Sequence, residues 1–140
     1  MGKATIDATD RKILSLLIRN ARMPFLEIAR ECGISGAAIH QRVKKMEESG
    51  VIRGFRLEVD PTALGYNVSA MIGIRINDPS MNFEIVDGLR RIPEVVECHF
   101  VTGKYNIWTR VYCVDHEHLM HTILDHILRV PGVSETETFI

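Results

Sequence analysis

The chain has 140 residues, 46% of them hydrophobic and 25% charged, which suffices for one ordinary domain or two small ones around packed cores. No apolar run is long enough to span a membrane, and the polar start MGKATIDATD lacks the apolar region of a signal peptide, so we expect a cytoplasmic protein. Three widely spaced cysteines, Cys32, Cys98 and Cys113, fit no metal-ligand pattern and are expected to be reduced thiols.

Charge is unevenly distributed along the chain. The formal net charge is −1, which alone argues against a nucleic-acid-binding protein. Residues 1–60, however, contain 11 Lys and Arg against 8 Asp and Glu, whereas residues 61–140 contain 6 against 10. This asymmetry predicts that the two halves have different functions: the basic half would bind a polyanion, and the acidic half would serve another purpose.

Two helices are predicted before residue 34. Asp7 is suited to cap the first, over IDATDRKILSLLIRN, because its carboxylate can accept the free N–H groups of the first turn. Apolar residues at helical spacing predict the buried face of this helix: Ile13, Leu14, Leu17 and Ile18. The second helix follows Pro24, a residue suited to a first helical turn, and ends at Gly33.

A third helix is predicted between Ser35, whose hydroxyl can cap it, and Gly50. Its buried seam consists of Ile39, Val43 and Met46. Because only the short turn GIS separates it from the second helix, the pair has the spacing of a helix-turn-helix. The small residues at its start would let its N-terminus approach the floor of a DNA major groove.

Polar residues on the opposite face of this third helix are candidates for DNA contacts. Gln41 can pair with an adenine edge, and Arg42 or Lys44 can pair with guanine or phosphate. Lys45, Arg53 and Arg56 are better placed for phosphate contacts, which position a protein without specifying sequence. The full candidate set is Ser35, Ala37, Ala38, His40, Gln41, Arg42, Lys44, Lys45 and Arg53. A solvated polar face without a partner is the alternative interpretation.

After the extended segment VIRGFRLEVDP, the second half predicts an α+β domain. Strands are expected within 66–77, 94–103, 105–114 and 132–140, and helices over 81–91 and 116–129. The residues expected to face inward from the helices are Phe83, Val86, Leu89, Leu119, Ile123 and Ile127, with Met120, Leu124 and Leu128 beside the last three. The order β-α-β-β-α-β is the ferredoxin-like arrangement, a four-stranded antiparallel sheet with both helices on one face.

These elements predict a two-domain organisation. We expect an N-terminal winged helix-turn-helix domain at 1–60, a linker at 61–65, and a ferredoxin-like domain at 66–140. The other face of the sheet would be bare, and a sheet this apolar predicts association with a second copy through that face. A dimer would also present two recognition helices to DNA, which compensates for the modest affinity of a single module.

The segment DHEHLMHTILDH (115–126) contains four of the six histidines. His118 and His121 are three residues apart and could share a metal with Asp125, but the spacing is not H-E-x-x-H. All three side chains fall on the polar face of the predicted helix, opposite Leu119 and Ile123. A solvated histidine-rich face is therefore the favoured interpretation, and we predict no metal and no other cofactor.

The turn TGKYN (102–106) is the other candidate site. A glycine there exposes backbone N–H groups that can hold a carboxylate, and Thr136 and Thr138 alternate onto one face of the last strand and offer hydroxyls. Together these groups could bind a small zwitterion. An ordinary hairpin turn is the alternative.

Several segments together resemble the Lrp/AsnC family, the leucine-responsive and asparagine-responsive feast/famine transcription regulators. They are IDATDRKILSLLIRNAR, EIARECGIS, IHQRVKKMEESGVIRGF, DPTALG, PEVVECHFVTGKYN and PGVSETETF, and they cover nearly the whole chain. The resemblance implies sequence-specific DNA binding and dimers that pair through the C-terminal sheets. It also implies further assembly into tetramers, octamers or larger discs, and an amino acid or related small metabolite bound between dimers.

The resemblance further implies which residues contact the effector. They are His99, Phe100, Val101, Thr102, Gly103, Tyr105, Asn106, Thr136 and Thr138. Members of the family often have an aspartate where Asn106 stands, and that aspartate can meet an effector's ammonium group. Asparagine keeps the hydrogen-bond acceptor but removes the charge, which leaves the affinity for an amino acid open.

Two other functions stay open. Tetrapyrrole (siroheme-type) decarboxylases share the two-domain architecture, and YNIW resembles one of their segments. Their histidine-rich loop is not matched by CHFVTGK, in which His99 is the only histidine. The second is a small protein that has lost DNA binding and keeps only the effector function. The basic third helix argues against it. We therefore expect a DNA-binding regulator and not an enzyme.

Overall fold

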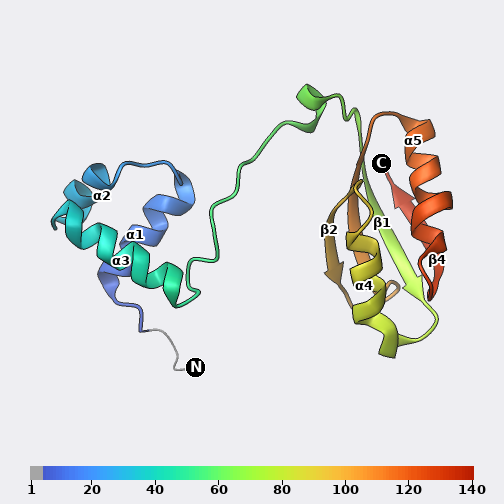
Figure 1. Ribbon diagram of the computed structural model, residues 1–140, viewed down its shortest axis with the longest axis horizontal. Helices are drawn as coiled ribbons and strands as arrows, with labels where there is room; N and C mark the ends of the chain where they lie inside the picture. The colour runs from blue at the N-terminus through green and yellow to red at the C-terminus, as the bar shows by residue number, and fades with distance from the viewer. Residues whose placement is uncertain (1–4) are drawn as a thin grey trace. The chain divides into compact units, whose positions relative to one another are not determined.

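The structure, a computed structural model, describes residues 5–140 and divides into two compact units after Glu58 (Figure 1). Each unit has its own cluster of buried apolar side chains. Within the described part of the chain, no helix is long and apolar enough to cross a membrane. The cysteines are free thiols; Cys113 is buried, and Cys32 and Cys98 are half-buried.

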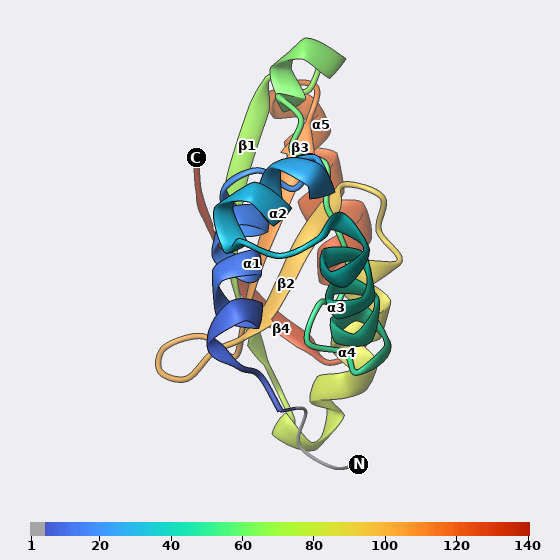
Figure 2. The ribbon, with the colours of Figure 1, turned by 90° about the vertical axis from the view of Figure 1, so that its left-hand side faces the viewer.

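Among its described residues the first unit contains three helices (Figure 2): α1 (Ala8–Arg19), α2 (Phe25–Cys32) and α3 (Gly36–Glu48). As predicted, Asp7 caps α1; its carboxylate accepts from the Asp10 N–H at 2.8 Å, and the Asp10 carboxylate accepts from the Asp7 N–H at 3.2 Å. This reciprocal pair is a capping box, which satisfies two otherwise free donors. Pro24 precedes α2, and Gly33 closes it with φ of 68°.

The helices of the first unit surround a core whose buried members are Ile13, Leu16, Leu17, Ile28, Ala29, Ile39, Val43 and Met46. The predicted seam of α3 is therefore confirmed. The prediction for Ile18 is wrong, because its side chain is 82% exposed. Ile18 lies about 100° around the helix from Leu17, and the buried stripe runs through Leu16 on the other side.

No strand forms between α3 and the second unit. Residues 53–60 run in an extended conformation without a sheet partner in the same chain, and a short 3₁₀ helix, η1 (Pro61–Leu64), follows. Asp60 caps η1, since its carboxylate accepts from the Thr62 N–H at 3.0 Å. The segment predicted as a linker thus contains ordered local structure.

The second unit has the predicted βαββαβ order. Its elements are β1 (Val68–Ile76), η2 (Pro79–Met81), α4 (Asn82–Arg90), β2 (Val95–Phe100), β3 (Ile107–Cys113), α5 (His116–His121), η3 (Thr122–His126), η4 (Ile127–Arg129) and β4 (Val133–Phe139). The four strands form one antiparallel sheet in the order β2-β3-β1-β4. The fold class expected from the sequence is confirmed.

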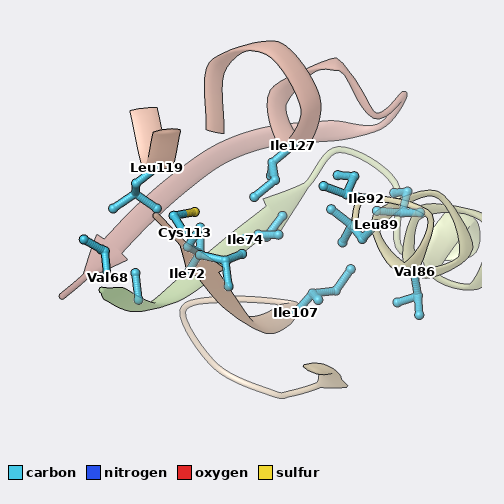
Figure 3. Packing of buried hydrophobic residues seen from close by; sticks show 13 residues of the cluster. Val68, Ile72, Ile74, Val86, Leu89, Ile92, Ile107, Cys113, Leu119 and Ile127 are labelled. Atoms are coloured by element: carbon cyan, nitrogen blue, oxygen red, sulfur yellow. The ribbon is translucent and has the colours of Figure 1, made fainter. Parts of the chain in front are cut away.

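One face of this sheet packs against both helices (Figure 3). Alternate residues of β1 and β3 point into that core, among them Ile72, Ile74, Ile107 and Val111. Leu89 of α4 and Ile127 of η4 fill it from the helix side. The remaining strand residues point to the opposite face, which no element of the second unit covers, and we call this the open face.

Two details of the helices differ from the predictions. Phe83 is 79% exposed, because Ile85 takes the inward position, and the Phe83 ring instead packs edge-on against Phe100 at 5.5 Å between ring centroids. The helix over 116–129 contains a π-helical stretch, η3, in place of a continuous α-helix. The wider turn changes the helical phase. Met120 and Leu124, expected beside the buried row, are 58% and 52% exposed.

Candidate DNA-binding and effector-binding sites

The candidate DNA contacts of α3 lie on its exposed side. Ala37, His40, Gln41, Lys44 and Lys45 are all exposed, while Ile39, Val43 and Met46 hold the other side of the helix in the core. Arg53 follows α3 and is also exposed. The five residues of α3 therefore lie on one accessible surface of the helix, and their contact with DNA stays a prediction.

The start of α3 is small for a structural reason as well. Ser35 uses its hydroxyl to cap the helix, accepting from the Ala38 N–H at 3.1 Å. A Cβ at Gly36 would lie 3.3 Å from the Leu26 side chain of α2, a tight contact. Gly36 thus lets the two helices of the helix-turn-helix approach closely. Ala37, on the exposed side, has a short side chain that projects little from the helix.

Arg42 occupies a different position from the other cations of α3. Its Nη1 donates to Asp7 Oδ2 at 2.7 Å and to Asp10 Oδ1 at 3.0 Å, so its charge is already paired within the unit. The hydrogen bond from Arg42 holds the pKa of the Asp7 carboxyl below its usual value, and the same bonds raise the pKa of Arg42. The structure separates Arg42 from the free cations Lys44 and Lys45.

The candidate effector turn is fixed to the end of the sheet by Asn106. The Asn106 N–H donates to the Ile74 carbonyl at 2.9 Å, and its side-chain Oδ1 accepts from the Ile76 N–H at 3.1 Å, beside an irregularity in the β1–β4 register. Within the turn, the Val101 N–H donates to the Asn106 carbonyl at 3.0 Å, and Gly103 adopts φ of 116°. The acceptor of Asn106 is therefore already used to position the turn.

Aromatic rings cover the open face next to this turn. The Tyr105 ring lies directly over Gly73, where an added Cβ would come within 2.8 Å of it. Tyr105 and Trp108 meet edge to face with centroids 5.4 Å apart, and Trp108 lies equally close to Phe139. Because Gly73 has no side chain, these rings can lie against the sheet beside the turn. We call the rings of Tyr105, Trp108 and Phe139 the aromatic platform.

An oppositely charged pair lies beside the platform. Lys104 Nζ is 2.6 Å from Glu137 Oε2 and 5.1 Å from the centroid of the Tyr105 ring. The pair joins the turn to β4 across the open face, and both side chains are solvent accessible. A cation and a carboxylate next to an aromatic surface are the groups that the carboxylate and ammonium of an amino acid would require.

Thr136 and Thr138 lie on the other face of the sheet. They pair with Ile74 and Ile72, whose side chains are in the core, so the pleat turns both threonines toward the helices. Glu137 alternates with them onto the open face. His99 pairs with Trp108, and Phe100 pairs with the core residue Ile107, so these two candidates also point in opposite directions.

Sequence reasoning missed Lys104, Glu137, Trp108 and Gly73 in this site. Lys104 and Glu137 are 33 residues apart, and only the β1–β4 register shows that they meet. A signal did exist for Glu137, since it lies between the two threonines on an alternating strand. Without the strand pairing, the sequence does not show whether the glutamates or the threonines of this strand face the core.

Two histidines of α5, His118 and His121, pair with neighbouring side chains. His118 Nδ1 accepts from the Val114 N–H at 3.1 Å, and Nε2 lies 3.0 Å from Glu94 Oε1, so both ring nitrogens have partners. His121 pairs with Asp125 at 2.8 Å, and this hydrogen bond raises the pKa of His121. Across residues 5–140, no group of three or more His, Cys, Asp or Glu is arranged to hold a metal ion.

Each of the two units matches a known protein family. Residues 6–53 match the winged helix-turn-helix DNA-binding family, and residues 69–140 match the Lrp/AsnC ligand-binding domain. The regulatory protein AsnC of Escherichia coli (strain K12) is 37% identical over 140 residues, which cover 100% of this chain and 92% of AsnC. The structure of E. coli AsnC matches with a TM-score of 0.86 at 36% identity, over 97% of this chain and 91% of AsnC.

Two other similar structures contain an amino acid. A Neisseria meningitidis transcriptional regulator in complex with L-methionine has a TM-score of 0.88 at 26% identity, covering 96% of this chain and 88% of its own. A feast or famine regulatory protein of M. tuberculosis complexed with L-methionine has a TM-score of 0.87 at 27% identity, covering 97% and 92%.

The packing of Tyr105 over Gly73 gives a testable prediction. In Gly73→Ala the new methyl group must displace the Tyr105 ring, and Trp108, the only tryptophan of the chain, will report this as a shifted emission maximum. Gly36→Ala is the matched control, because it adds the same methyl group in the first unit. Unchanged Trp108 emission in Gly73→Ala would show that the ring does not lie there.

Proposed function

Because the chain belongs to the Lrp/AsnC family of transcriptional regulators, we propose that it binds specific DNA sequences through α3, acts as a homo-oligomer, and responds to an amino acid. The observation that carries this proposal is the exposed surface of α3, with Gln41, Lys44 and Lys45 in one continuous stretch. The relatives are named regulators, which gives no support to the decarboxylase alternative. We place its action in the cytoplasm, where its thiols stay reduced.

DNA recognition by α3 follows from the chemistry of its free side chains. Lys44 and Lys45 supply charges for phosphates, and the ion pair of Lys44 with Glu48 is a loose one, at 4.0 Å between exposed side chains. Gln41 offers the amide that pairs with an adenine edge. Ala37 and Gly36 keep the N-terminal end of the helix narrow enough to enter a major groove.

We assign the effector site to the open face around Tyr105, Lys104 and Glu137. In the free protein, Lys104 and Glu137 pair with one another. An amino acid could separate them, with its carboxylate on Lys104 and its ammonium on Glu137, while its side chain packs against the aromatic platform. Glu137 would then supply the negative charge that Asn106 lacks. The two L-methionine complexes among the relatives are the reason for choosing an amino acid.

Two surfaces support association of identical chains. The open face carries Met71, Trp108 and Tyr112 without a covering element. The extended segment 53–60 alternates apolar and charged residues, and Leu57 is 87% exposed at its centre. If two copies pair antiparallel about Leu57, Arg56 of each lies opposite Glu58 of the other, so the segment is complementary to itself.

DNA binding is tested by fluorescence anisotropy on the protein's own upstream DNA and on a scrambled duplex. Replacing Lys44 and Lys45 together by Ala should weaken binding to both duplexes, since phosphate contacts carry no sequence information. Gln41→Ala should instead reduce discrimination between the duplexes by about 1–3 kcal/mol. The control removes the adjacent exposed pair Arg90 and Arg91 at the C-terminal end of α4. Variants of α3 that bind like the wild type would refute its role.

Effector binding is tested by titrating Trp108 emission with L-methionine and then with other L-amino acids. Lys104→Met and Glu137→Gln should each weaken binding by about ten- to a hundredfold, because each removes a charge-assisted hydrogen bond worth roughly 1.5–3 kcal/mol. Glu135→Gln is the matched control, since Glu135 stands on the same face of β4 and pairs with Arg75 at 3.3 Å. Equal affinities in all three variants would exclude this site.

Self-association through the extended segment is tested by sedimentation equilibrium. Arg56→Glu places like charges opposite one another twice in an antiparallel pair, and each such pair costs about 0.2–1 kcal/mol, so the dimer should weaken several-fold. Adding Glu58→Arg restores complementarity and should restore the dimer. An unchanged dissociation constant in Arg56→Glu would mean that this segment does not pair.

A further inference from the structure

We propose that Arg42 is a positioning residue: it fixes α3 against the N-terminus of α1 and does not itself contact DNA. The inference rests on the proposed DNA binding by α3 and concerns which of the helix's cations reach the nucleic acid. By sequence alone, Arg42 stands beside Gln41 and two residues before Lys44, and all three are candidates for contact. The structure gives Arg42 a different task.

Arg42 joins two helices through its guanidinium, and we call its paired bonds to Asp7 and Asp10 the clamp. A single nitrogen, Nη1, donates to carboxylates of both Asp7 and Asp10, at 2.7 and 3.0 Å. These acids lie 35 and 32 residues away along the chain, so the bonds join the recognition helix to the first turn of α1. The Arg42 side chain is 35% exposed, whereas that of Lys44 is 66% exposed.

The two carboxylates are themselves held in place. Asp7 and Asp10 form the capping box of α1, in which each accepts the backbone N–H of the other. The Asp10 side chain is only 11% exposed. A carboxylate with so little access to water needs a partner, and removing the cation would leave it uncompensated. Arg42 therefore has a fixed counterpart on the other helix before any DNA arrives.

This arrangement decides how Arg42 affects binding. The Arg42 guanidinium already has two carboxylates as partners, and this cluster of one cation and two anions carries a net negative charge, which opposes the approach of a phosphate. Arg42 therefore contributes no free cation for a phosphate. It instead fixes the rotation of α3 about its axis, and the neighbouring Gln41 is presented in a single direction as a result.

The salt dependence of DNA binding separates a positioning residue from a contact. Each phosphate contact adds about 0.9 to the slope of log K against log salt concentration. Arg42→Met combined with Asp10→Asn removes the clamp without changing net charge, and Asp7 stays as the N-cap. We expect affinity to fall in parallel at every salt concentration, with the slope unchanged. Lys44→Met should lower the slope by about 0.9, which marks a true contact.

Two outcomes would overturn the inference. A slope that falls in the Arg42→Met, Asp10→Asn variant as it does in Lys44→Met would make Arg42 a phosphate contact. Affinity equal to the wild type at all salt concentrations would mean that the clamp positions nothing. The control, Arg91→Met with Asp87→Asn, removes an exposed ion pair of α4 at 2.7 Å and should alter neither quantity.

A second measurement needs no disruptive variant. The guanidinium ¹⁵N–¹H signal of Arg42 in the wild type, assigned with Arg42→Lys, should keep its chemical shift when DNA is added, and a large shift would overturn the inference. Failure of the proposed function gives a different result. If wild type and Lys44→Met both lack affinity and salt dependence, α3 does not bind DNA; if only the Arg42 results depart from expectation, DNA binding stands.

Discussion

The pleat of the four-stranded sheet is the constraint on which the second unit depends. Successive residues of β1 and β3 point to opposite faces, so Ile72 and Ile107 enter the core while Trp108 and Tyr112 do not. Within the second unit, the helices cover one face of the sheet, and no element covers the other. The same alternation places Glu137 beside Lys104 and turns Thr136 away. The candidate effector site and the surface available for a second copy therefore follow from one register.

The sequence predicts the elements well, because their signals are local. A cap at Asp7, a left-handed glycine at Gly33 and alternation along the strands each depend on a few neighbouring residues. The incorrect predictions concern residues at the border between the buried and the exposed side of a helix. Ile18, Phe83 and Leu124 all lie next to a buried stripe, and periodicity indicates that a stripe exists without indicating where it ends. At Leu124 the π-helical stretch adds a phase change that no local motif marks.

The sites were harder to predict than the fold, because their decisive contacts are distant in sequence. Arg42 looks like any cation of a recognition helix until Asp7 and Asp10 are placed beside it. Lys104 lies in the turn between β2 and β3 and Glu137 lies in β4, so they meet only in the folded sheet. Asn106 replaces a charge that the family resemblance led us to expect, but its acceptor already positions the turn by holding the Ile76 N–H. In each case a pairing between elements decides the role of a residue.

In the proposed function one chain couples an amino-acid site to a DNA-binding helix, and coupling between two ligands is reciprocal. The measurement that tests it most directly is the affinity for upstream DNA with and without a saturating amino acid, together with the amino acid's affinity with and without DNA. We predict that both affinities change by the same factor. An amino acid that binds at Trp108 and leaves DNA affinity unchanged would contradict the claim.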